Sequence, residues 1–235
     1  ILFLDAGVAD TKIPDSVLRK GSPAIGLYDP RKALVNVKGV TCEHLFVNLE
    51  RLSNGGFAAN FNAAIGRNHD VIVTMEPWKA KNLQKDANLL ANILSGKYDA
   101  QFLHLFDILK NQTTKKIYLR FLHEMEIPIT RYPWQSQDPV KYIKAFRHFV
   151  KLLQHKPANI YMVWGPAGDR GSMEFWPGSD VVDYVSIAIY GLPDKNITDH
   201  TKQESFSTIF KRKYRRIASS HKPLLITEFG VKGPE

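Results

Sequence analysis

The segment Ile117-Tyr118-Leu119-Arg120-Phe121-Leu122-His123-Glu124 decides the fold that this sequence predicts. Its first six residues form an almost continuous apolar run, which is typical of a strand buried on both faces of a parallel sheet. A histidine and a glutamate follow at the point where the run ends. In (β/α) barrels the active site is assembled from the carboxyl ends of the strands, so polar residues at this point favour such a barrel.

Six further short apolar runs are spaced along the whole chain. They cover residues 24–28, 44–48, 71–75, 160–164, 185–190 and 223–227. Helical patterns lie between them, with apolar residues three and four apart over 80–94 and 140–153. Asp138-Pro139 supplies an N-cap and a first-turn proline for the second helix. Strands that alternate with helices predict βαβ units in one parallel sheet.

Two architectures contain such a sheet: a closed barrel and an open, doubly wound sheet of the dinucleotide-binding type. Neither G-x-G-x-x-G nor G-x-x-x-x-G-K-[ST] follows any run, which argues against the second. Five other runs also end on polar or aromatic residues, namely Tyr28-Asp29-Pro30, Glu76-Pro77-Trp78, Trp164-Gly165-Pro166, Tyr190-Gly191 and Glu228-Phe229-Gly230. No linker or composition shift divides the chain. We therefore predict an α/β fold, a (β/α)8 TIM-type barrel forming a single domain over residues 1–235.

Composition excludes several classes of protein. The 235 residues are 44% hydrophobic and include one cysteine, Cys42, which argues against disorder and against a disulfide scaffold. The sequence contains no run of about 18 apolar residues, so it predicts no membrane span. The net charge of +9 raises the possibility of a nucleic-acid partner. The densest basic run, 211–216, has apolar neighbours at helical spacing, so we interpret it as a solvated helix face and expect no nucleic acid.

Two carboxylates, Glu124 and Glu228, follow apolar strands at the predicted barrel mouth. Glycoside hydrolysis needs such a pair, one to protonate the leaving oxygen and one to attack or to activate water. His123 and Tyr190 are candidate orienting groups, and three tryptophans offer flat faces for sugar rings: Trp78, Trp134 and Trp164. Glu76 also ends a predicted strand. It is either a third carboxylate of the site or a structural partner for Arg120. With neither H-E-x-x-H nor a Cys/His cluster, we expect no metal and no cofactor.

Ten short motifs occur in an order that resembles glycoside hydrolase family 26, a family of β-mannanases and related endo-β-glucanases. They are G-L-Y-D-P at 26–30, E-H-L-F-V-N at 43–48, T-M-E-P-W at 74–78, S-G-K-Y-D at 95–99, R-F-L-H-E-M at 120–125, Y-P-W at 132–134, W-P-G at 176–178, D-Y-V at 183–185, Y-G at 190–191 and I-T-E-F-G at 226–230. The resemblance runs from about residue 24 to the end of the chain. It implies a (β/α)8 retaining glycosidase.

The resemblance also implies roles for individual residues. Glu124, after His123, matches the family's acid/base, and Glu228 matches its nucleophile. Tyr190 matches the tyrosine that donates a hydrogen bond to the nucleophile. The tryptophans of E-P-W and Y-P-W, Trp78 and Trp134, match residues that line the sugar cleft. The implied reaction is double displacement with retention on a β-linked polysaccharide such as mannan, mixed-linkage glucan or an exopolysaccharide.

Two departures from the family pattern affect these expectations. Family members have Asn-Gly soon after His-Glu-Met, whereas here residues 126–131 intervene before Y-P-W, so we expect a remodelled subsite. Glu126 and Arg131 are expected either to face an unusual, charged sugar or to form a surface ion pair in a loop. The chain stops seven residues after Glu228, so the eighth strand is either missing or supplied by the N-terminal segment 1–5. We expect a monomer that is extracellular or periplasmic. The alternative function is a non-catalytic carbohydrate-binding or polysaccharide-synthesis-associated barrel.

Overall fold

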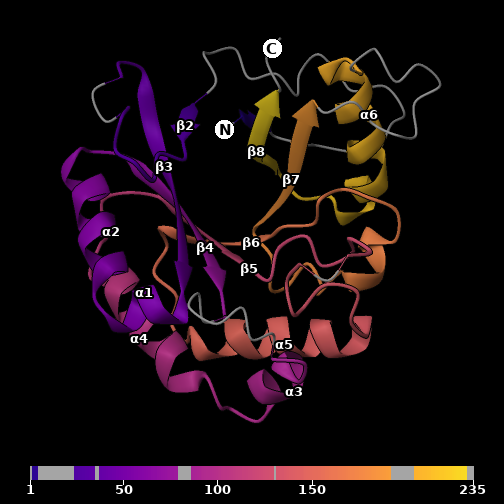
Figure 1. Ribbon diagram of the computed structural model, residues 1–235, viewed down its shortest axis with the longest axis horizontal. Coiled ribbons are helices and arrows are strands. Elements are labelled where there is room, and N and C mark those ends of the chain that lie inside the picture. The colour runs from indigo at the N-terminus through magenta and orange to yellow at the C-terminus, as the bar shows by residue number, and fades with distance from the viewer. Residues whose placement is uncertain are drawn as a thin grey trace.

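A curled sheet of eight strands forms the centre of the protein, with strand order β1-β8-β7-β6-β5-β4-β3-β2 (Figure 1). The computed structural model describes residues 2–4, 24–34, 37–78, 86–129, 131–191 and 204–231. The strands are β1 (Leu2–Leu4), β2 (Ile25–Leu27), β3 (Val40–Asn48), β4 (Asp70–Glu76), β5 (Ile117–Phe121), β6 (Ile160–Trp164), β7 (Tyr184–Gly191) and β8 (Leu224–Val231). The seven apolar runs of the sequence thus correspond to β2 through β8.

The seven strands β2 to β8 pair in parallel, each with its neighbour in the chain, as the βαβ pattern predicts. The N-terminal segment takes the place beside β8, which was one of the two predicted alternatives. It pairs there in the antiparallel direction, with Leu2 opposite Ile226 and Leu4 opposite Leu224. Among the described residues β1 does not pair with β2, so they form an open, curled barrel rather than a closed ring of eight parallel strands.

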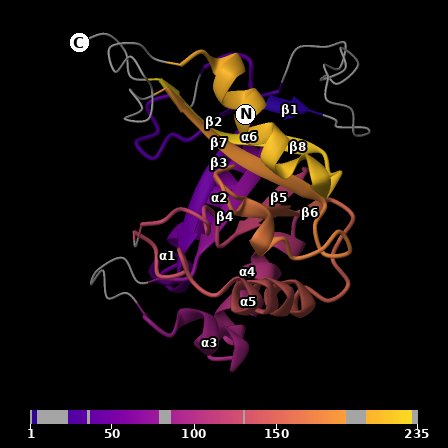
Figure 2. The ribbon, with the colours of Figure 1, turned by 90° about the vertical axis from the view of Figure 1, so that its right-hand side faces the viewer.

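Helices cover the outer face of this sheet (Figures 1 and 2). They are α1 (Leu49–Ser53), α2 (Gly56–Gly66), α3 (Leu89–Leu94), α4 (Asp99–Lys110), α5 (Pro139–Leu152) and α6 (Phe206–Ile217), with short 3-10 turns η2 (Ser172–Phe175) and η3 (Ala218–Ser220). The predicted helix over 140–153 is confirmed as α5, and the Asp138 carboxylate caps it by accepting from the N–H of Val140 at 2.7 Å. The predicted helix over 80–94 is observed from Leu89 onward, and residues 79–85 lie outside the described residues. No helix in the described ranges is long and apolar enough to cross a membrane.

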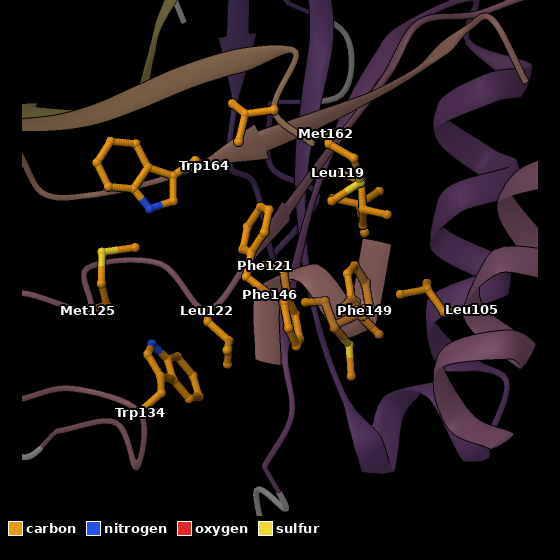
Figure 3. Close-up of a cluster of buried hydrophobic side chains, with 14 of the residues drawn as sticks. Leu105, Leu119, Phe121, Leu122, Met125, Trp134, Phe146, Phe149, Met162 and Trp164 are labelled. Atoms are coloured by element: carbon orange, nitrogen blue, oxygen red, sulfur yellow. The ribbon is translucent and has the colours of Figure 1, made fainter. Parts of the chain in front are cut away.

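The main core lies between the sheet and these helices (Figure 3). Phe121 of β5 stacks on Phe149 of α5 with ring centroids 3.9 Å apart. A second, smaller cluster contains Cys42, Ile72, Tyr118, Val163 and Leu225, one from each of five neighbouring or facing strands. The strands are therefore apolar on both faces, which explains why their sequences read as continuous apolar runs.

The basic run 211–216 lies on α6, whose buried side is formed by Ile209, Phe210 and Ile217. The helical spacing of the sequence predicted this arrangement. The prediction that the basic residues form a solvated helix face is confirmed only in part. Lys213 and Arg216 donate hydrogen bonds to carbonyl groups of the loop after β6.

Candidate active site

Arg120 is a cation buried inside the curled sheet. Its side chain is 1% exposed and spans from β4 to β8. Nε donates to the hydroxyl of Thr74 at 2.8 Å, and Nη1 donates to the hydroxyl of Thr227 at 3.0 Å. The Nε2 atom of His44 lies 2.7 Å from the same Thr74 oxygen. Burial, together with the charge of Arg120, lowers the pKa of His44 to about 3, so this imidazole is neutral.

Glu228 is the anion that Arg120 holds. Its Oε1 accepts from Nη2 of Arg120 at 2.6 Å, and its Oε2 accepts from the hydroxyl of Tyr190 at 2.6 Å. Burial alone would raise the pKa of Glu228. The charge of Arg120 and the two hydrogen bonds outweigh burial and lower the pKa to about 2. Glu228 is therefore ionised at neutral pH, with both oxygens oriented.

An irregularity between β7 and β8 places Glu228 in this position. The pairing register shifts between Ile187 and Ala188, so that Ile187 faces Ile226 while Ala188 faces Glu228. Thr227 is the extra residue on β8. In a regular strand two successive side chains point to opposite faces, yet Thr227 and Glu228 both bind Arg120. A bulge of this kind re-aims side chains, and such irregularities are common beside active sites.

Glu124 is held in a different way, through its backbone. Its φ of 54° lies in the left-handed region. Its N–H donates to the Gly165 carbonyl at 2.8 Å, and its carbonyl accepts from Nε2 of Gln135 at 3.2 Å. Among the residues that the structure describes, none donates a hydrogen bond to the carboxyl group of Glu124. Burial, and secondarily the negative charge of Glu228, raises the pKa of Glu124 to about 7. It can therefore hold a proton at neutral pH.

His123 and Glu76 lie beside this pair. His123 is 1% exposed, and its Nε2 is 3.8 Å from Oε1 of Glu76. Burial and the charge of Arg120 hold the pKa of His123 well below its usual range, so the ring is neutral. Burial also raises the pKa of Glu76 to about 7, although its Oε2 accepts from the indole of Trp78 at 3.1 Å. The hypothesis that Glu76 pairs with Arg120 is wrong in this structure, where Arg120 forms its ion pair with Glu228.

The three predicted tryptophans lie in two different environments. Trp134 and Trp164 are both 0% exposed and belong to the core (Figure 3). The indole of Trp134 donates to the His123 carbonyl at 2.7 Å, so it supports the site from behind. Neither ring offers a free face to a sugar, in contrast to the expectation from sequence. Trp78 is partly exposed and packs edge-on against Tyr132, with centroids 5.4 Å apart.

Exposed aromatic side chains lie near the polar residues. Tyr190 is 47% exposed and Tyr28 is 54% exposed. Phe229 is also exposed, at 59%, but its ring packs against Phe206 of α6 on the outer face of the sheet. Tyr28 packs edge-on against Phe46 at 5.0 Å, and the Phe46 ring lies 5.8 Å from the guanidinium of Arg120. A pocket beside β2, β3 and α2 is lined by residues that include Tyr28, His44 and Arg67, and neither Glu124 nor Glu228 lines it. No group of three or more His, Cys, Asp or Glu within the described ranges could hold a metal ion.

Sequence reasoning missed the residues that tune the carboxylates. Arg120 has a recognisable signal, a single charge inside an otherwise apolar strand, and its partner could not be read from the sequence. Thr74 and Thr227 have none, since threonine is common in strands. Phe46 resembles an ordinary strand residue, and only the structure shows that its ring lies beside the guanidinium of Arg120.

No protein-family profile matches the chain. It is 28% identical over 199 residues to endoglucanase H of Acetivibrio thermocellus, covering 79% of this chain and 21% of that protein. It is also 28% identical to a beta-1,3-xylanase of Alcaligenes sp and to beta-1,3-xylanase TXYA of Vibrio sp, covering 67% of this chain and 33% and 34% of those proteins. The chain thus spans a fifth to a third of the length of these curated relatives.

Solved structures also resemble the fold. A GH5-4 broad specificity endoglucanase from Clostridium longisporum superposes with a TM-score of 0.57 at 12% identity, covering 82% of this chain and 63% of that chain. At this identity the likeness bears on the fold alone, and it supports a (β/α)-type barrel.

Proposed function

We propose that this chain is the catalytic part of a retaining endo-β-glycanase, with Glu228 as nucleophile and Glu124 as general acid and base. One observation carries the proposal: at the same end of the barrel, both oxygens of Glu228 are bound by Arg120 and Tyr190, whereas Glu124 is fixed only through its backbone. These environments displace the two pKa values in opposite directions, to about 2 for Glu228 and about 7 for Glu124. Double displacement requires one ionised and one protonated carboxyl group, and different environments are how proteins provide them. The endoglucanase and xylanase names of the relatives support the same class of reaction.

The reaction has two steps. In the first, an oxygen of Glu228 bonds to the anomeric carbon, the bond from that carbon to the leaving oxygen breaks, and Glu124 transfers its proton to this oxygen. In the second, Glu124 takes a proton from water, the water oxygen bonds to the anomeric carbon, and Glu228 leaves as a carboxylate. The hydrogen bonds from Arg120 and Tyr190 orient Glu228 for both steps.

The surrounding aromatic residues support an elongated carbohydrate substrate. Trp78, Tyr28 and Tyr190 expose ring area near the two carboxylates, and aromatic faces pack well against sugar rings. The net charge of +9 and the exposed Arg131, whose guanidinium lies 5.2 Å from the centre of the Tyr132 ring, favour a polymer that bears negative groups. Such polymers are found outside the cytoplasm, which is where we place the enzyme.

The test begins with a screen of the full chain on β-1,4-glucan, β-1,3-xylan, mixed-linkage glucan, mannan and polymers that contain uronic acids. On the substrate found, Glu228→Ala should lower kcat by about 10⁴-fold or more, because it removes the nucleophile. Glu124→Ala should slow aryl glycosides with good leaving groups much less than the polysaccharide, because a good leaving group needs no proton. Asp180→Ala, which removes an exposed carboxylate, is the control.

The stereochemistry is tested by following the first product by NMR. Retention of the β-anomer is expected, and an initial α-product would contradict the double displacement. Binding of a polysaccharide without hydrolysis by the parent chain would favour the non-catalytic alternative. Full activity of both Glu228→Ala and Glu124→Ala would refute the assignment of these residues.

A further inference from the structure

One carboxylate near the site has no role in the reaction described above. Glu126 lies two residues after Glu124, and its side chain reaches the loop that follows β6. Its Oε1 accepts hydrogen bonds there from the N–H groups of Gly168 at 2.9 Å and Asp169 at 3.0 Å. The hydroxyl of Ser172 lies 3.0 Å from the same Oε1 and 2.5 Å from the Asp169 carbonyl, so its single proton is shared between these two acceptors. Its Oε2 is buried and accepts no hydrogen bond from any residue that the structure describes.

The same loop is held from its other side by α6. Nζ of Lys213 donates to the Ala167 carbonyl at 2.6 Å, and Nη1 of Arg216 donates to the Gly168 carbonyl at 3.1 Å. Gly168 has a φ of +84°, and a Cβ at this position would lie 2.9 Å from Cβ of Lys213. The Glu126 carboxylate thus accepts hydrogen bonds from amide groups of this short loop, while Lys213 and Arg216 donate to its carbonyl groups.

This loop also positions Glu124. Gly165, three residues before Gly168, provides the carbonyl that accepts the N–H of Glu124. The left-handed conformation of Glu124 is unfavourable for a residue with a side chain, and such conformations persist only where the surroundings enforce them. A displacement of the loop would release this contact and move the Glu124 carboxyl group.

We propose that Glu126 is a positioning residue for Glu124: it fixes the loop after β6 to the strand end that bears Glu124 and places a negative charge beside that carboxyl group. This proposal rests on the proposed function, because it assumes that Glu124 acts as an acid. A neighbouring negative charge favours the protonated form that an acid needs. The other titratable or charged groups that act on Glu124 or feel its charge are Glu228 of β8, Arg120 of β5, Lys213 of α6, Tyr190 of β7 and Tyr132 of the loop before α5.

The first test separates charge from shape. Glu126→Gln keeps an acceptor oxygen for the loop but removes the negative charge. The alkaline limb of the kcat/KM profile should move to lower pH by about 0.5 unit, because Glu124 then loses its proton more easily. Glu174→Gln is the matched control, since it makes the same substitution at an exposed position of η2, and it should leave the profile unchanged.

The second test removes one donor and keeps the charge. Ser172→Ala should lower kcat by about 2-fold to 10-fold, without moving the alkaline limb, because it removes the hydroxyl that lies between Oε1 of Glu126 and the Asp169 carbonyl and so loosens the loop. An unchanged pH profile and unchanged kcat in Glu126→Gln would overturn the proposal. A loss of kcat with an unmoved limb would overturn the part that concerns charge.

A titration of the Glu124 carboxyl carbon by NMR distinguishes this proposal from the proposed function. The midpoint should fall in Glu126→Gln whether or not a substrate is known. A lower midpoint in a chain that hydrolyses nothing would remove the proposed function and keep the electrostatic role of Glu126. An unmoved midpoint would remove that role, whatever the activity of the parent chain.

Discussion

Glu228 near the carboxyl end of β8 and Glu124 after β5 are held in different ways, one through its side chain and the other through its backbone. At the end of β8 the side chain of Glu228 is fixed, with one oxygen bound by Arg120 and the other by Tyr190. At the end of β5 the backbone of Glu124 is fixed by Gly165 and Gln135, and the carboxyl group is left without a described donor. A nucleophile gains from fixed, charged oxygens, whereas an acid must give up and regain a proton. The two modes of support therefore match the two proposed roles.

The largest effect is expected where the support of Glu228 is broken. Arg120→Met should lower kcat by about 10³-fold and destabilise the protein by about 3–5 kcal/mol, because it leaves a buried carboxylate without its cation. Activity and thermal unfolding measure the two effects. Arg67→Met is the matched control: its partner Glu43 lies on the outer side, Arg67 is 31% exposed, and about 0–1 kcal/mol is expected.

A double variant shows whether the cost comes from the unpaired charge. Arg120→Met combined with Glu228→Gln should regain stability relative to Arg120→Met alone, while remaining inactive. Equal destabilisation by Arg120→Met and Arg67→Met would mean that the internal pair is no more important to the fold than the external one.

The second expected effect concerns the other oxygen of Glu228. Tyr190→Phe removes a hydrogen bond to a charged group and should lower kcat by about 10–10²-fold. Because that bond helps to keep the pKa of Glu228 low, the acidic limb of the rate profile should also move to higher pH. Tyr98→Phe removes a similar hydroxyl contact, to Asp86 at 2.7 Å, and serves as the control. Matching pH profiles in Tyr190→Phe and the parent would contradict this role.

The third expected effect is a change of stability with pH at Glu124. Its pKa in the folded protein, about 7, exceeds the ordinary value of 4.5, so its contribution to stability is present below that ordinary value and is lost as pH rises through about 7. Glu124→Gln should therefore stabilise the protein relative to the parent by about 2–3 kcal/mol more at pH 8 than at pH 5. Denaturant unfolding at the two pH values measures this difference. A constant difference would show that the Glu124 carboxyl titrates normally.

The sequence predicted the strands and both carboxylates because these depend on local patterns. Apolar runs mark β2 to β8, and polar residues mark where they end, so the places of Glu124 and Glu228 near strand ends could be predicted without coordinates. Their catalytic roles stay predictions. The antiparallel pairing of β1 could not be predicted, since three apolar residues fit either direction. The burial of Trp134 and Trp164 could not be predicted either, because a residue near a strand end faces the site or the core according to the loop that follows. The ion pair of Arg120 joins residues 108 positions apart.

The smallest expected effect tests how closely β7 and β8 must approach to orient Glu228. A Cβ on Gly230 would lie 3.0 Å from Cδ1 and 3.1 Å from Cε1 of the Tyr190 ring. Since Tyr190 is exposed, the ring can move outward at little cost to stability, but its hydroxyl then leaves Glu228. Gly230→Ala should thus lower kcat by about 3-fold to 10-fold with little change in Tm. Gly66→Ala, where a Cβ meets nothing within 4 Å, should keep full activity. Because the effect acts through the Tyr190 hydroxyl, Gly230→Ala should lower kcat no further in a Tyr190→Phe background, and additive losses would show that Gly230 acts on the site by another route.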